Sequence, residues 1–113
     1  MDKFMKKAHF FLENQKELGL KDDQLQTIKS LKIEAKKAYI RQMAEMEVFK
    51  LDLDQKMAEP KVDVKALDDM IDGMAAQMSA AAKVTVNSYA QLKAVLSDEQ
   101  MGKAKEIWTK KRD

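Results

Sequence analysis

Pro60 is the only proline in this 113-residue chain, and only three glycines accompany it. Proline lacks the backbone amide hydrogen that a helix interior needs and clashes with the preceding turn, so a helix does not normally continue through it. Few other residues on either side of Pro60 favour a turn. The chain is therefore predicted to be all-α, with one long helix before a turn near residue 60 and another after it.

Apolar residues recur at spacings of three and four on both sides of this turn, which is the period of an amphipathic helix. The ranges expected to be helical are 2–18, 22–57, 63–95 and 98–111. Residues 1–113 are thus predicted to form a single domain, a long antiparallel helical hairpin with short flanking N- and C-terminal helices. In the last helix the apolar positions expected to face inward are Met101, Ala104, Ile107 and Trp108.

Two copies of one short phrase mark the starts of helices. Residues 20–24 read Leu-Lys-Asp-Asp-Gln, and residues 96–100 read Leu-Ser-Asp-Glu-Gln. In the second copy, the Ser97 hydroxyl is placed to accept the amide of Gln100, whose side chain can reach back to the start of the helix, as in a capping box. In the first copy a lysine replaces the serine, so the cap is expected either at Asp22 or without a side-chain acceptor. The motif residues are Leu20, Asp22, Gln24, Leu96, Ser97 and Gln100.

Paired phrases of this kind around a helical hairpin resemble the Leu-Thr-x-x-Gln family of small bacterial envelope proteins. That family contains the Spy/CpxP chaperones and related heavy-metal-resistance and metal-sensor domains. The resemblance covers roughly residues 15–112, and Lys21 departs from it where threonine is expected. It implies a periplasmic protein that forms an elongated antiparallel homodimer of bent hairpins with a concave, cradle-like face.

The first twenty residues are not expected to be an export signal themselves. Lysines occur at positions 3, 6 and 7, but Glu13, Asn14 and Gln15 interrupt the apolar stretch that follows. This pattern is typical neither of a signal peptide nor of a membrane span, so no membrane insertion is expected. If the family resemblance holds, an export signal was removed from the chain.

Composition argues against several classes of function. Lysine and arginine (21 residues) are interleaved with aspartate and glutamate (19 residues), and the formal net charge is only +2, so no nucleic-acid partner is expected. Cysteine is absent and histidine occurs once, which leaves no disulfide, thiolate or zinc–thiolate site. Since no glycine-rich phosphate loop is present either, we expect no enzyme and no required cofactor.

Two helices side by side cannot enclose a core. Apolar residues that lie off the main apolar stripe of each helix would be exposed to water in a monomer, and such surfaces mark interaction sites. A homodimer is therefore expected. The residues in question are Leu31, Met43, Leu51, Met70 and Tyr89.

Nine methionines are present, six of them in the two long helices. Methionine is flexible and polarisable, so a surface rich in it can repack against partners of different shapes. Met74 and Met78 lie on the apolar stripe and are assigned to the core, whereas Met43 and Met70 lie off it. With the family resemblance, this predicts an ATP-independent chaperone or stress adaptor that binds unfolded or misfolded envelope proteins. The predicted contact residues are Met43, Met46, Phe49 and Met70, with Lys36 and Lys50 beside them.

The alternative is a periplasmic heavy-metal-binding resistance or sensor-regulatory protein. Family members that sense metals often use histidines near the start of the domain, and this chain has His9 with Met5 four residues earlier. One imidazole and one thioether make a weak site for a divalent transition metal. This alternative would have a membrane sensor protein as its partner. A third interpretation is a purely structural dimerisation module.

Overall fold

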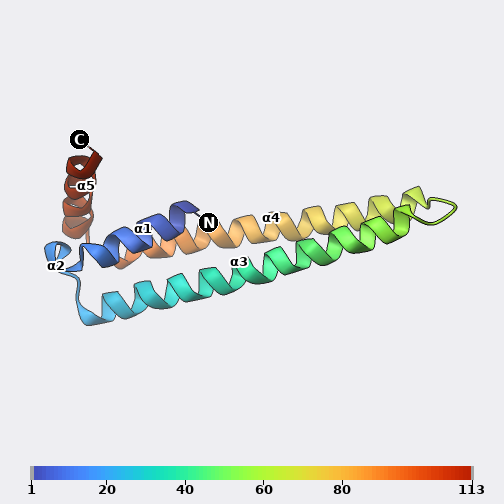
Figure 1. The fold of residues 1–113 in the computed structure, drawn as a ribbon. Helices are drawn as coiled ribbons and strands as arrows, with labels where there is room; N and C mark the ends of the chain where they lie inside the picture. Colours follow the sequence, from blue (N-terminus) through green and yellow to red (C-terminus); the bar gives the residue numbers. More distant parts are fainter. Residues whose placement is uncertain (1, 113) are drawn as a thin grey trace. The chain divides into compact units, whose positions relative to one another are not determined.

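The computed structural model describes residues 2–112, and this part of the chain is all-helical (Figure 1), which confirms the predicted fold class at that level. The helices are α1 (Asp2–Glu13), α2 (Gln15–Leu18), α3 (Asp22–Met57), α4 (Val64–Val95) and α5 (Asp98–Arg112). The chain divides into two compact units. Unit 1 contains Met1–Lys36 and Thr85–Asp113, and unit 2 contains Lys37–Val84.

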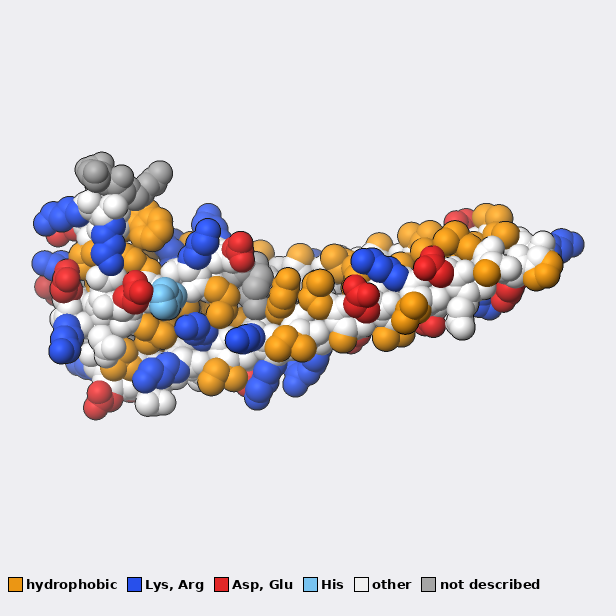
Figure 2. All heavy atoms as spheres, in the orientation of Figure 1, with side chains coloured by type: hydrophobic (Ala, Val, Ile, Leu, Met, Phe, Trp, Pro, Cys, Tyr) orange, Lys and Arg blue, Asp and Glu red, His pale blue; other side chains and the backbone are white. Residues whose placement is uncertain are grey.

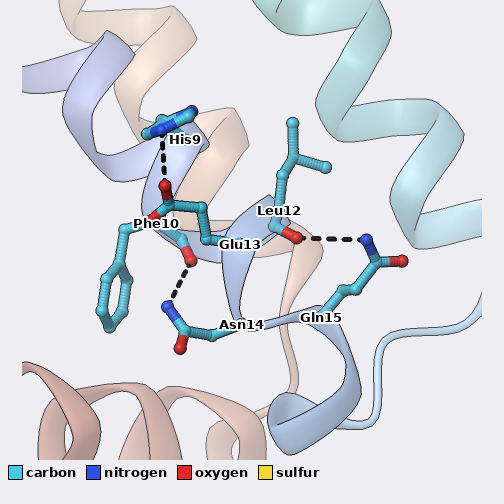
Figure 3. Close-up of polar contacts among 6 residues, drawn as sticks. All are labelled: His9, Phe10, Leu12, Glu13, Asn14 and Gln15. Atoms are coloured by element: carbon cyan, nitrogen blue, oxygen red, sulfur yellow. Dashed lines mark hydrogen bonds and ion pairs between the residues drawn. The ribbon is translucent and has the colours of Figure 1, made fainter.

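The single helix predicted over residues 2–18 is wrong, because the chain leaves the helix at Asn14. Asn14 is buried, and its side-chain Nδ2 donates to the Phe10 carbonyl at 2.8 Å (Figure 3). Next to it, Gln15 Nε2 donates to the Leu12 carbonyl at 3.1 Å (Figure 3). The Phe10 carbonyl also accepts the Asn14 backbone amide at 3.1 Å, so the Asn14 side chain adds a second donor there. The Leu12 carbonyl, in the last turn of α1, needs a partner from outside the helical ladder, and the Gln15 side chain supplies it. The chain can therefore end α1 and start the four-residue α2.

Gly19 ends α2 in the left-handed conformation, with φ 67° and ψ 40°. Its amide donates to the Lys16 carbonyl at 3.1 Å, and the Leu20 amide donates to the Gln15 carbonyl at 3.0 Å. This pair of bonds is a Schellman motif, which glycine favours because it has no Cβ to clash at positive φ. The tight turn brings the chain directly into α3.

The buried apolar residues lie in unit 1. Helix α1 contributes four of them, Phe4, Ala8, Phe10 and Phe11. Burying a phenylalanine side chain stabilises a fold by about 1.5–3 kcal/mol, so α1, with three of them, is an essential part of the core. The others come from α2, α3, α4, α5 and the turn before α5: Leu18, Ile28, Leu92, Leu96, Ala104 and Ile107.

Unit 2 consists of the second part of α3, the first part of α4 and the connection at residues 58–63. The connection contains Pro60, and the Asp63 carboxylate accepts the Ala66 amide at 3.1 Å, which caps α4. The two helices lie side by side in Figure 1, and Gln42 Nε2 contacts Met78 Sδ across them at 3.5 Å. Every residue of 37–84 is described and none is buried, so unit 2 has no core of its own.

Candidate functional site

The second phrase forms a reciprocal cap at the start of α5. Gln100 donates its backbone amide to the Ser97 hydroxyl at 3.1 Å, and Ser97 donates its backbone amide to Gln100 Oε1 at 2.9 Å. These two bonds are those of a capping box, with glutamine at the third helical position. The start of α5 is thereby satisfied by its own side chains.

The first phrase forms only part of this arrangement, because Lys21 occupies the cap position of α3. Lysine offers no acceptor. Gln24 Oε1 nevertheless accepts the Lys21 amide at 2.8 Å, as Gln100 does for Ser97. Asp23, and not the predicted Asp22, supplies the carboxylate of the first turn. Its Oδ1 accepts a hydrogen bond from the Gln24 amide at 2.9 Å.

The side-chain amides of Gln24 and Gln100 face each other, 76 residues apart in sequence. Gln24 Nε2 donates to Gln100 Oε1 at 2.7 Å, and Gln100 Nε2 donates to Gln24 Oε1 at 3.2 Å. Gln24 Nε2 also donates to the Val95 carbonyl at 2.9 Å, and Gln100 Nε2 donates to the Gly19 carbonyl at 3.0 Å. Each amide thus uses two donors and two acceptors, which is its full capacity. We call these two residues the glutamine pair.

The bonds of the glutamine pair follow an approximate two-fold pattern. Gly19 lies two residues before the cap position Lys21, and Val95 lies two residues before Ser97. Each glutamine therefore caps the helix to which it belongs and donates a hydrogen bond to the turn before the other helix. The repeated phrase predicted two local caps, and the structure joins them into one network within unit 1. The shared glutamine at the fifth position of both copies was the sequence signal for this link.

A hollow of about 940 Å³ adjoins the glutamine pair. Four carboxylates and two ammonium groups border it, so the charge around it is net negative and disfavours an anionic ligand. They are Glu17, Lys21, Asp23, Glu99, Lys103 and Glu106. An amide pair provides neither a nucleophile nor a titrating group, so the network acts on stability and geometry.

The residues predicted to contact unfolded proteins differ in how accessible they are. Met43 is 45% exposed, whereas Met46, Phe49 and Met70 are half-buried in unit 2. Lys50 is exposed and lies 3.8 Å from Glu47, the distance between Nζ and Oε1. Lys36, in unit 1, is also exposed. The structure thus leaves one of the four predicted apolar contacts largely open.

Unit 2 exposes apolar side chains that we had predicted to be in the core or had not discussed. The assignment of Met78 to the core is wrong, because its side chain is 41% exposed, while Met74 is half-buried. Two packed helices cover only a narrow stripe on each other, so even a residue on the stripe keeps an open side. Figure 2 shows apolar side chains among charged ones on the surface of this part of the chain. Val48 and Leu51 are 56% and 66% exposed.

Of the residues expected to be exposed in a monomer, Met43 and Leu51 are exposed, but the expectation is wrong for Leu31, Met70 and Tyr89, which are half-buried. Leu31 and Tyr89 pack against the core of unit 1. Tyr89 lies beside α1, with Lys3 and Lys7 Nζ 5.8 and 5.6 Å from its ring centroid, and such a contact between distant segments has no local signal in the sequence.

His9 and Met5 do not form a metal site with further donors in the part of the chain that the structure describes. His9 Nε2 lies 2.8 Å from Glu13 Oε1, and the two side chains are 61% and 54% exposed (Figure 3). Met5 is half-buried against the core. Over residues 2–112, no group of three or more histidine, aspartate or glutamate side chains is placed to hold a metal ion.

Comparison with known proteins gives a simple result. No family model, curated protein or solved structure matches this chain. The resemblance to the Leu-Thr-x-x-Gln family therefore depends on the two phrases and the helical pattern around them. Within the described residues, no helix has a segment both long and apolar enough to cross a membrane.

Trp108 was predicted to face inward, and this is wrong. Its side chain is 47% exposed, although Ala104 and Ile107 of the same helix are buried. The indole packs edge-to-face on Phe10, with ring centroids 5.2 Å apart and an interplanar angle of 87°. One side of the indole is therefore fixed by an aromatic neighbour while the rest meets solvent.

Proposed function

We propose that this chain is an ATP-independent periplasmic chaperone or stress adaptor of the Spy/CpxP type, which binds unfolded or misfolded envelope proteins on unit 2. The observation that carries the proposal is the surface of unit 2, which lacks a buried core and exposes many large apolar side chains. Such surfaces mark interaction sites in soluble proteins. The exposed residues are Tyr39, Ile40, Met43, Val48, Leu51, Met57, Val62, Val64, Ile71, Met78 and Val84.

Binding on this surface would be weak and reversible. Met43 and Met78 are flexible side chains that can adapt to differently shaped apolar segments. The nearby charges add only screened contacts, because Lys50 and Lys65 are exposed and lie near Glu47 and Asp69, at 3.8 Å and 3.6 Å. No nucleotide is needed for such binding, since release follows from the low affinity itself.

The proposal includes an antiparallel hairpin of α3 and α4 and a homodimer of such hairpins. A pair of helices without a core gains stability when a second copy covers part of its apolar surface. The mass in solution tests this directly. Light scattering at micromolar concentration should give twice the 12.9 kDa of the chain, and a monodisperse monomer would contradict the dimer.

The binding surface is tested by diluting a chemically unfolded protein into buffer with a stoichiometric amount of this chain and no nucleotide. We expect suppressed aggregation. The combined variant Met43→Ser, Met46→Ser, Phe49→Ser and Met70→Ser should lose most of that protection while keeping its helical circular dichroism and its oligomeric state. Ile33→Ser with Val86→Ser, at exposed apolar positions of unit 1, is the matched control and should protect normally.

Two outcomes would contradict the proposal. If the wild-type chain fails to suppress aggregation of several unfolded proteins, the chaperone function is wrong. If the fourfold serine variant protects as well as the wild type, the function stands but its assignment to these residues is wrong.

A metal-linked function is the second candidate, and the exposed His9–Glu13 pair is the observation in its favour. One imidazole and one carboxylate fill only part of a transition-metal coordination sphere, so these two residues do not fit a sensor site by themselves. We expect nickel and copper titrations to show no site tighter than about micromolar. A tighter site that His9→Ala removes would favour a metal-resistance or sensor-regulatory protein, with a membrane sensor as partner.

A further inference from the structure

Unit 1 contains a second surface, which is separate from the residues of the proposed function. It is a groove of about 650 Å³ formed by α1, α4 and α5, and a volume of this size is typical of ligand-binding pockets. Its floor is apolar and largely aromatic. The floor residues are Phe10, Phe11, Tyr89, Met101, Ala104 and Trp108.

Lysines from three helices surround this floor. Lys3, Lys6 and Lys7 come from α1, Lys93 from α4 and Lys105 from α5. Among the residues that the structure describes, no acidic side chain lines the groove. In addition, none of these five lysines makes an ion pair with any residue that the structure describes. We call this surface the lysine-rimmed groove.

The ammonium groups converge on the aromatic floor. Lys3, Lys7 and Lys93 lie 5.8, 5.6 and 5.9 Å from the centroid of the Tyr89 ring. Contacts of this type are weakly favourable at an exposed site, which offsets part of the repulsion among the like charges. Because Tyr89 can balance these three cations only partly, the groove should attract anionic groups.

Both the floor and the rim restrict what can bind. An apolar floor with an exposed Trp108 favours aromatic or long aliphatic side chains. A rim with cations on three sides favours several anionic groups spread along the ligand. A fatty acid or detergent has one charged head and can satisfy only one side of the rim. A peptide segment with alternating acidic and apolar residues can satisfy all of them.

We propose that the lysine-rimmed groove binds an acidic peptide segment in which carboxylates alternate with aromatic or long aliphatic side chains. The carboxylates pair with Lys3, Lys7, Lys93 and Lys105, and an apolar side chain packs against Tyr89 and Trp108. Binding here does not depend on the proposed function of unit 2. The two surfaces belong to different units of the chain and have different chemistry.

Trp108 provides the test, because it is the only tryptophan and lies in the groove. The probe is a decapeptide of alternating glutamate and leucine with one central phenylalanine, acetylated and amidated at its ends. We expect a saturable change in Trp108 fluorescence that weakens as salt is raised. The control peptide has lysine in place of every glutamate and should not bind.

Charge reversal on the rim completes the test. Lys7→Glu with Lys93→Glu should weaken binding of the acidic peptide by about tenfold or more. Lys103→Glu, also on the surface of unit 1 but beside the glutamine pair, should change the affinity less than about twofold. Circular dichroism verifies that each variant is folded.

Three results would overturn the proposal: no saturable response to the acidic peptide, equal binding of the lysine peptide, or binding that is unaffected by the reversal at Lys7 and Lys93. Saturable binding of dodecanoate without binding of the acidic peptide would also overturn it, because a single-headed amphiphile would then be the ligand.

Discussion

The glutamine pair makes a quantitative prediction about stability. Its two side-chain amides take part in six hydrogen bonds. Gln24→Ala removes four of them, Gln100→Ala removes four, and two are common to both changes. Because the pair is only partly buried, we assign each bond about 0.5 kcal/mol, the lower end of the usual net range. Each single variant should then lose about 2 kcal/mol of unfolding free energy, and the double variant about 3 kcal/mol.

The two losses should therefore not be additive. The sum of the single effects exceeds the double effect by about 1 kcal/mol, which is the coupling energy of the two shared bonds. Urea unfolding followed by Trp108 fluorescence measures this quantity, because the only tryptophan belongs to unit 1 and reports on that unit. Gln26→Ala is the matched control. It removes an exposed glutamine of the same helix and should change stability by less than about 0.5 kcal/mol.

Additive losses would show that the two amides act independently, each as a local cap. Single losses below about 0.5 kcal/mol would show that water replaces the amides without penalty. Either result would refute the interpretation that the glutamine pair links the turn before α3 to the turn before α5.

Three further predictions use the same urea assay. Gly19→Ala should destabilise unit 1 by about 1–2 kcal/mol because of the positive φ at this position. Gly102→Ala, inside α5 with open space around a new Cβ, should instead stabilise unit 1 by about 0.5–1 kcal/mol. Equal effects of the two changes would exclude backbone strain as the cause. Asn14→Ala should cost about 1 kcal/mol, since the Phe10 carbonyl loses its side-chain donor, and an unchanged midpoint would contradict that role. Phe11→Ala should cost about 3–5 kcal/mol because the side chain is 1% exposed, and a loss below about 1 kcal/mol would show that α1 is not an essential part of the core.

Local signals in the sequence predicted part of this structure. Pro60 and the long apolar periods predicted helices on both sides of the turn, and the structure places α3 and α4 there. Gly19 and Ser97 act within a few residues of themselves, so their roles as helix terminators and caps could be inferred from their neighbours. Asn14 also acts locally, but asparagine inside a helical pattern carries no unique signal for a break.

The features that the sequence did not reveal depend on contacts between distant segments. The amides of Gln24 and Gln100 meet only when the turns before α3 and α5 are brought together. The contact of Trp108 with Phe10 likewise joins residues from opposite ends of the chain. The lysine-rimmed groove has the same origin, since its lysines come from three helices. No spacing within a single helix indicates such a site.

The central claim is that unfolded proteins bind to unit 2, and the methionine methyl groups can report this binding directly. The measurement is a methyl NMR spectrum of the methionine-labelled chain, with and without a protein kept unfolded by carboxymethylation of its cysteines. We predict shifts or broadening at Met43, Met46 and Met70, with Met5 of unit 1, which does not line the lysine-rimmed groove, unchanged. Changes confined to the methionines of unit 1, or no changes at all, would contradict the claim.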